Sequence, residues 1–235
     1  YYVFVHKPIH LLFIYKTIIM KKIKLLLVAG ACVVLSACSP QAPTVHTTDK
    51  GTQWEWNEGT IVVKSPERPA GQKSVIGLTA PKMEVVRVGF VGLGMRGPGA
   101  VSRFTHIPGT QIVALCDYDP KRAEACQNIL KKASMPKAAI YSGETGYEEL
   151  CKRDDIDLVY IAADWLHHFP IAKCALENGK HVAIEVPSAM NLQECWDLVN
   201  LSETTRKHCF ILENCCYDSV SYTHLRAHET CADLV

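Results

Sequence analysis

The most constraining feature of this sequence is a glycine-rich turn that directly follows a run of β-branched residues. Residues 85–91 read V-V-R-V-G-F-V, and G-L-G-M-R-G follows at 92–97. A strand that ends in G-x-G-x-x-G and continues into a helix favours a dinucleotide-binding turn. In such a turn Gly92 permits the tight bend, Gly94 lets the backbone approach a diphosphate, and Gly97 lets the helix pack closely on the sheet.

Strand-like and helix-like segments alternate from this turn to residue 214. The alternation predicts an α/β fold, a doubly wound parallel sheet with helices on both faces. We therefore expect one Rossmann-type, NAD-binding domain over residues 85–214. Its strands are expected at 85–91, 111–116, 138–141, 157–163, 181–185 and 208–212, and its helices at 95–104, 120–133, 147–152, 169–178 and 191–207.

Polar and aromatic residues gather where successive predicted strands end, and ligands of open α/β sheets bind along that edge. Asp117 ends the second strand, where a carboxylate would accept hydrogen bonds from the adenosine ribose and repel a 2′-phosphate. This favours NAD over NADP. Singly, each group also fits an ordinary structural role, such as a solvated turn or a helix cap. Beyond Asp117, the groups that follow the fourth, fifth and sixth strands are Trp165, Leu166, His167 and His168, then Glu185 and Val186, then Asn214.

The beginning of the chain carries the features of an exported protein. We interpret residues 1–19 as translated upstream sequence and Met20 as the start of a signal peptide over residues 20–37, with a basic beginning and a short apolar core. The alternative is a membrane anchor made from both apolar segments. Residues 35–38 read L-S-A-C and resemble a bacterial lipobox, in which Cys38 is lipidated. The expectation is a lipoprotein in the periplasm or outer membrane of a Gram-negative bacterium, attached only through its lipid.

Two further segments are interpreted from composition. Residues 38–84 are rich in Pro, Thr, Ser and Gly, which predicts a tether with at most one docked segment. Residues 219–235 show no strand or helix period and resemble a foreign tail, so residues 215–218 are expected to begin a domain that is missing here.

Charge and cysteine spacing exclude several classes of function. The 235 residues carry 25 Lys and Arg against 24 Asp and Glu, a formal charge of +1 that gives no reason to expect nucleic acid as a partner. None of the 11 cysteines forms C-x-x-C, which argues against a zinc ribbon or a thioredoxin-type motif. No metal site is predicted, and most cysteines are expected to be buried free thiols.

The motifs resemble those of a known enzyme superfamily. The glycine turn, Asp117 and the strand-end E-V-P at 185–187 are similar to the glucose–fructose oxidoreductase and inositol dehydrogenase superfamily. Most of its members have lysine where this chain has Val186. Four motifs taken together resemble those of glycoside hydrolase family 109 instead. They are G-L-G-M-R-G-P-G-A-V at 92–101, W-L-H-H at 165–168, E-V-P at 185–187 and E-N-C-C-Y at 213–217.

That resemblance implies an exported bacterial α-N-acetylgalactosaminidase that acts on glycans with terminal α-N-acetylgalactosamine and uses bound NAD. It implies oxidation of the sugar, elimination of the glycosidic bond, addition of water and reduction, and it leaves homo-oligomerisation possible. The catalytic residues lie in the missing α+β domain, so none is assigned here. Two alternatives stay open, an exported NAD(P)-dependent sugar oxidoreductase and a non-catalytic lipoprotein that binds a sugar or a partner. The implied cofactor contacts are Met95, Arg96, Asp117, Trp165, Leu166, His167, His168, Glu185, Val186 and Asn214.

Overall fold

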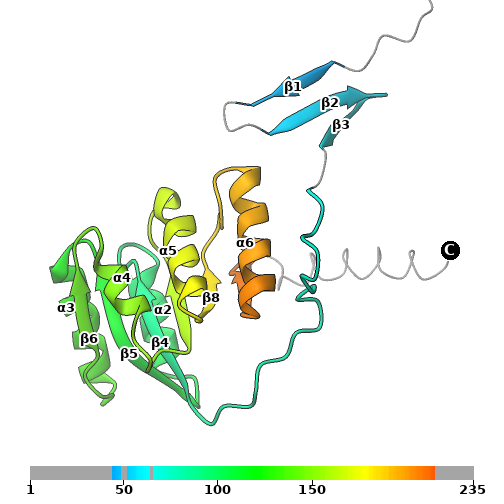
Figure 1. The fold of residues 1–235 in the computed structure, drawn as a ribbon. Coiled ribbons are helices and arrows are strands. Elements are labelled where there is room, and N and C mark those ends of the chain that lie inside the picture. The colour runs from blue at the N-terminus through cyan, green and yellow to red at the C-terminus, as the bar shows by residue number, and fades with distance from the viewer. Residues whose placement is uncertain (1–43, 49–51, 64–65, 215–235) are drawn as a thin grey trace, which may run out of the picture. The chain divides into compact units, whose positions relative to one another are not determined.

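The computed structural model describes residues 44–48, 52–63 and 66–214, which divide into two compact units (Figure 1). The smaller unit is an antiparallel sheet of three strands, β1 (Val45–Thr47), β2 (Gln53–Asn57) and β3 (Thr60–Val63). Glu58 and Gly59 join β2 to β3 with positive φ at both positions, as a two-residue hairpin turn of type I′ requires. Composition did not predict this sheet.

The larger unit is a six-stranded parallel sheet with the order β6-β5-β4-β7-β8-β9. This order is that of a complete doubly wound dinucleotide fold, and the predicted fold class is confirmed. Its strands are β4 (Val86–Val91), β5 (Thr110–Asp117), β6 (Ala139–Ser142), β7 (Leu158–Ile161), β8 (His181–Ile184) and β9 (Cys209–Ile211). Its helices are α2 (Gly97–Phe104), α3 (Pro120–Lys132), α4 (Gly146–Cys151), α5 (Trp165–Glu177) and α6 (Leu192–Thr205).

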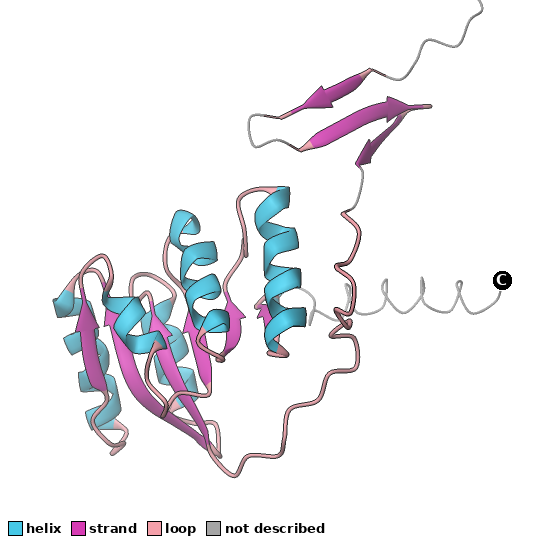
Figure 2. Ribbon diagram, viewed as in Figure 1, coloured by secondary structure: helices cyan, strands magenta, loops and turns pink. Residues whose placement is uncertain are grey.

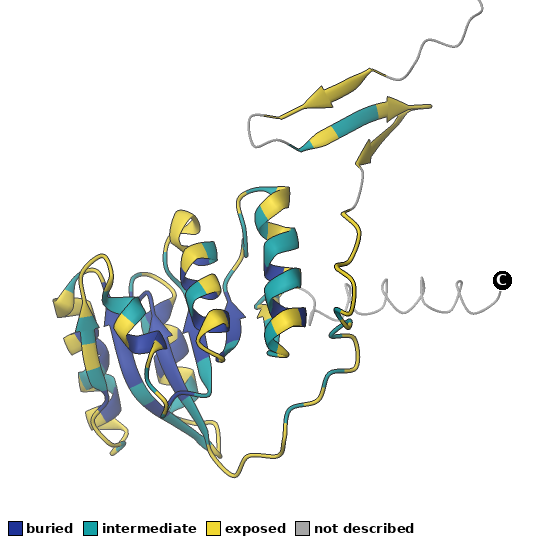
Figure 3. Ribbon diagram, in the orientation of Figure 1, coloured by how far each residue is buried: buried dark blue, intermediate teal, exposed yellow. Residues whose placement is uncertain are grey.

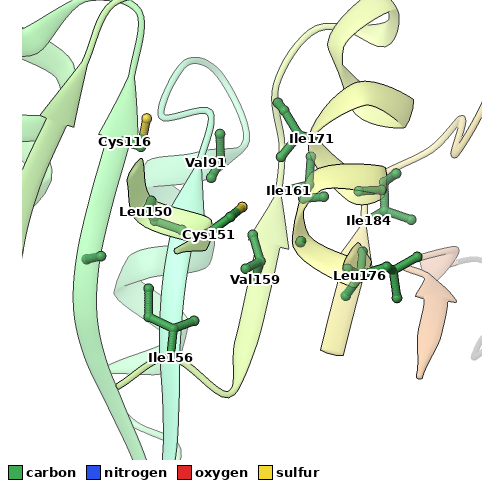
Figure 4. Packing of buried hydrophobic residues seen from close by; sticks show 14 of the residues in the cluster. Val91, Cys116, Leu150, Cys151, Ile156, Val159, Ile161, Ile171, Leu176 and Ile184 are labelled. Atoms are coloured by element: carbon green, nitrogen blue, oxygen red, sulfur yellow. The ribbon is translucent and has the colours of Figure 1, made fainter. Parts of the chain in front are cut away.

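Helices cover both faces of this sheet (Figure 2). On one face, buried side chains of α2 and α3 pack around Phe90 of β4 and Tyr160 of β7, whose rings stack. On the other face, α4, α5 and α6 enclose a second cluster that includes Leu150, Ile161 and Leu176 (Figure 4). The central strands are therefore the most deeply buried elements, as the dark blue strands of Figure 3 show. Burial on both sides agrees with the near-continuous apolar sequence of these strands.

Helix α5 begins four residues earlier than the sequence suggested, at Trp165 rather than Phe169. The Asp164 side chain accepts a 3.0 Å hydrogen bond from the Leu166 N–H and so caps the helix. His167 and His168 consequently lie in the first turn of a helix and not in a solvated turn, which was the alternative to a role in cofactor binding. Pro170 also lies inside α5.

A segment that composition placed in the tether docks on α6. The Arg68 guanidinium donates two hydrogen bonds to the Glu203 carboxylate, at 2.9 and 3.0 Å. Gln72 donates to Glu203 and to Asn200, and the Arg206 guanidinium donates to the backbone carbonyls of residues 73 and 74. Residues 66–78 are called the docked segment below.

Within residues 44–48, 52–63 and 66–214, no helix is both long and apolar enough to cross a membrane. The expectations for residues 1–19, the signal peptide, Cys38, residues 215–218 and the tail at 219–235 lie outside the described residues.

Candidate cofactor pocket

The glycine turn after β4 is tightly packed on one side and open on the other. Gly92 has φ +90°, and a Cβ there would collide with the backbone of Ala162 and Ala163 at the end of β7. A Cβ at Gly97 would collide with the Gly92 carbonyl oxygen. A Cβ at Gly94 would meet only the Arg122 guanidinium, at 3.3 Å. The first and third glycines are thus required by close packing, and the second leaves room for a ligand, as the sequence motif predicts.

Asp117 at the end of β5 holds this turn in place. One carboxylate oxygen accepts a 2.6 Å hydrogen bond from the Leu93 N–H, and the other accepts one of 2.9 Å from the Asp119 N–H. The Arg122 guanidinium lies 3.7 Å from the carboxylate. The Asp117 side chain is 5% exposed. Because a carboxylate offers about four lone-pair sites, these bonds leave acceptor capacity for a ribose hydroxyl.

A cavity of about 880 Å³ extends from this turn along the carboxyl edge of the sheet. Its size is sufficient for a dinucleotide, because ligand pockets are ordinarily about 300–1,000 Å³. Three of the predicted cofactor contacts, Gly92, Gly97 and Leu166, do not line this cavity. The predicted site residues that do line the cavity are Gly94, Met95, Arg96, Asp117, Trp165, His167, His168, Glu185, Val186 and Asn214.

Asp164 and His167 form a pair at the start of α5. The His167 Nδ1 lies 2.6 Å from an Asp164 carboxylate oxygen, and both side chains are about half-exposed. Burial opposes ionisation of Asp164, but the contacts with His167 and the hydrogen bond from the Leu166 N–H together hold its pKa below the usual value. The ionised carboxylate holds the His167 imidazole, and both residues line the cavity.

Glu185, which directly follows β8, is held by a hydrogen bond from the neighbouring strand β7. The Tyr160 hydroxyl donates a 3.0 Å hydrogen bond to its carboxylate. Burial and the neighbouring Glu185 charge raise the pKa of Tyr160 to about 12, so this phenol keeps its proton at any physiological pH. The Val186–Pro187 peptide bond that follows is cis. Val186 is exposed and presents an apolar side chain where most superfamily members carry lysine.

Residues 86–212 match the sequence pattern of a protein family described as an oxidoreductase family with an NAD-binding Rossmann fold. These residues contain the whole parallel sheet from β4 to β9. The chain belongs to this family.

The resemblance to glycoside hydrolase family 109 is also confirmed. The chain is 81% identical over 184 residues to glycosyl hydrolase family 109 protein 5 of Phocaeicola vulgatus, an alignment that covers 78% of this chain and 35% of the relative. It is 48% identical over 154 residues to an α-N-acetylgalactosaminidase of Bacteroides fragilis, covering 66% of this chain and 36% of the relative. The chain thus spans about a third of the length of these curated relatives.

A solved structure supports the assignment of the family fold. Myo-inositol dehydrogenase from Lactobacillus casei, in complex with NAD(H) and myo-inositol, is 27% identical to this chain with a TM-score of 0.51. The match covers 57% of this chain and 38% of that one. Residues 86–212 of this chain are therefore an NAD-binding Rossmann domain of this family.

Sequence reasoning missed several residues of this family member's pocket. Tyr118 is 76% exposed beside Asp117, and Arg122 is the first-turn residue of α3 that reaches back over Gly94. Their positions follow from the turn between β5 and α3, which has no recognisable motif of its own. The other lining residues that we did not predict include Gly143, Glu144 and Tyr147 near the end of β6.

The cavity holds acidic and basic groups but no metal cluster. Among the described residues, no group of three or more His, Cys, Asp or Glu side chains could hold a metal ion. Cys116 lines the cavity, and burial together with the Asp117 charge raises the pKa of its thiol to about 12. A thiol in that state is not a nucleophile at neutral pH. The pocket is therefore suited to holding a cofactor and not to attack by a cysteine.

Proposed function

We propose that this chain supplies the NAD-binding part of an exported glycosidase that removes terminal α-N-acetylgalactosamine from glycans. One observation carries the proposal: a dinucleotide-sized cavity, lined by Gly94 of the glycine turn and by Asp117, occurs in a chain that is 81% identical to a glycosyl hydrolase family 109 protein. The substrate class is supported by the name of the Bacteroides fragilis relative, an α-N-acetylgalactosaminidase.

The residues present fit NAD. The amides of the open turn at Gly94 and the start of α2 suit a diphosphate, because helix N-termini bind anions. The Asp117 carboxylate has remaining acceptor capacity for ribose hydroxyls and would repel a 2′-phosphate, which favours NAD over NADP. Glu185 and the His167 imidazole lie at the strand ends on the other side of β4, where the nicotinamide half of a dinucleotide belongs.

NAD, when bound, would supply a hydride acceptor that takes a hydride from a sugar carbon and returns it after the glycosidic bond is eliminated and water is added, so the cofactor is unchanged and the net reaction is hydrolysis. The contribution of this chain is to hold and orient the cofactor through that cycle. Asp117 fixes the turn, and Tyr160 fixes the Glu185 carboxylate beside the cavity. Val186 supplies no proton at a position where most superfamily members have a lysine that assists hydride transfer. This difference favours a glycosidase over an ordinary sugar dehydrogenase.

A chimeric enzyme tests the proposal. Residues 86–212 of this chain replace the matching segment of the Phocaeicola vulgatus relative, and hydrolysis of an aryl α-N-acetylgalactosaminide is measured without added NAD. We expect hydrolysis at a rate comparable to that of the parent, with NAD retained through purification. Oxidation of a free sugar with net NADH formation, and no hydrolysis, would support the oxidoreductase alternative. A folded chimera that shows neither activity would support the non-catalytic alternative.

Export as a lipoprotein is a separate part of the proposal, and it is supported only by the sequence of residues 20–38. The test is incorporation of a labelled fatty acid by cells that express the chain. Label should be incorporated by the parent and lost in Cys38→Ala. Label that persists in the variant, or a parent that is unlabelled, would contradict lipidation at Cys38.

A further inference from the structure

His168 is the most deeply buried of the predicted cofactor contacts, at 1% exposure. Its Nδ1 lies 2.6 Å from the Pro187 carbonyl oxygen, and its Nε2 lies 3.0 Å from the Ala163 carbonyl oxygen. Carbonyl oxygens only accept hydrogen bonds, so each ring nitrogen must donate. A neutral imidazole has one N–H, whereas the imidazolium has two. Both contacts can be hydrogen bonds at the same time only when the His168 ring carries a proton on each nitrogen.

The two carbonyl groups belong to different walls of the cavity. Ala163 follows β7 and packs against Gly92, so it also supports the glycine turn. Pro187 follows β8 and the Glu185–Val186 pair that lines the cavity. His168 itself is anchored in the first turn of α5. One side chain thus connects two strand-end turns, residues 162–164 and residues 185–187, that are distant in sequence.

We propose that His168 is a positioning residue, which as the imidazolium donates to Ala163 and Pro187 together and so fixes the separation of the two turns that form one end of the cofactor cavity. Its ring nitrogens are already engaged, so it acts on the cofactor through the two turns that carry Ala163 and Pro187 and not by a hydrogen bond of its own. The link to cofactor binding rests on the proposed function. The double donation does not, because it concerns only the protein.

Nuclear magnetic resonance tests the double donation directly. The chain is labelled with ¹⁵N histidine, and the His168 signals at pH 7.5 are assigned from the spectrum of His168→Gln. An unperturbed imidazole is mostly neutral at this pH. We expect a proton on both ring nitrogens of His168. One bare nitrogen in the folded protein would overturn the proposal.

Affinity for NAD, measured by calorimetry, tests the positioning role. His168→Phe keeps a ring but has no donors, and His168→Gln restores a donor amide. The matched control is His106→Phe, the same change at an exposed loop position. We expect NAD affinity to fall at least tenfold in His168→Phe, to recover partly in His168→Gln, and to change less than twofold in His106→Phe.

Equal affinity in His168→Phe and the parent would overturn the positioning role. If His168→Phe does not fold, the NAD affinity of His168→Gln tests the positioning role, and the spectrum of the parent tests the double donation. A parent that does not bind NAD at all would contradict the proposed function, and the protonation of His168 would still be decided by the spectrum.

Discussion

The Leu93 amide donates a 2.6 Å hydrogen bond to the carboxylate of Asp117, which joins the glycine turn after β4 to the end of β5. The same carboxylate accepts from the Asp119 amide at the start of the next loop. Asp117 therefore shapes the protein before any cofactor arrives. Its expected contact with ribose is a second role of the same side chain, and the two roles predict different mutational effects.

Replacing Asp117 with Ala leaves two amide groups without their acceptor. Because an unsatisfied buried donor costs about 1–3 kcal/mol, we expect a loss of stability of that order, together with loss of NAD binding. Asp117→Asn keeps one acceptor oxygen, so its stability should fall between those of the parent and Asp117→Ala. Urea unfolding and NAD titration measure the two effects. The control is Asp154→Ala at an exposed position, and equal stability of Asp117→Ala and the parent would refute the structural role.

Gly92→Ala tests the close packing of the turn. Gly92 has positive φ, and a methyl group there would meet the backbone of Ala162 and Ala163. Gly179 also has positive φ, at +72°, but its nearest neighbour would be the flexible end of Lys207 at 3.9 Å. We expect Gly179→Ala to cost about 1 kcal/mol from backbone conformation alone, and Gly92→Ala to cost clearly more. Similar urea midpoints for the two variants would contradict the packing of the turn.

Asp157 and Arg87 link the beginnings of β7 and β4. The backbone N–H and the guanidinium of Arg87 both donate to the Asp157 carboxylate. The hydrogen bonds from Arg87 outweigh burial and hold the pKa of Asp157 below its usual value. Its contribution to stability is therefore present above about pH 4 and is lost as the pH falls through the folded-state pKa.

The matched variant is Asp157→Asn. Its urea midpoint should lie below that of the parent at pH 7, and the difference should shrink as the pH is lowered toward 3. A difference that is constant over this range would show that ionisation of Asp157 does not stabilise the fold.

The docked segment should become accessible when its anchor is removed. Arg68→Ala deletes the pair of hydrogen bonds to Glu203, a carboxylate whose pKa is lowered chiefly by Arg68. We expect proteases to cleave residues 66–78 several-fold faster in this variant, with cleavage inside the parallel sheet unchanged. Lys82→Ala, an exposed basic residue outside the segment, is the control. Unchanged cleavage in Arg68→Ala would contradict docking through this pair.

The sequence predicted the parallel sheet well because each of its strands is a short apolar run between helical segments. It did not predict the sheet at 45–63, where Trp54 and Trp56 lie among polar residues and no helical segments mark the strand ends. The position and the partners of the docked segment were missed for a related reason. Arg68 and Gln72 gain their partners from a helix more than a hundred residues away, and composition carries no information about such pairs.

Local motifs were sufficient to predict the glycine turn at Gly92 and Gly97 and the position of Asp117 at the end of its strand. The role of His168 was not predicted, because it depends on two carbonyl oxygens that only the folded chain brings together. Glu185 was placed correctly at the cavity, but the Tyr160 hydroxyl that holds it comes from the neighbouring strand. Pairs across strands of a parallel sheet are set by strand order, which a single motif does not encode.

Calorimetric titration of the purified chain with NAD and with NADP tests the central claim most directly. The account predicts one saturable NAD site per chain and at least tenfold weaker binding of NADP, because the Asp117 carboxylate repels a 2′-phosphate. A folded chain that does not bind NAD, or that binds NADP equally well, would contradict it.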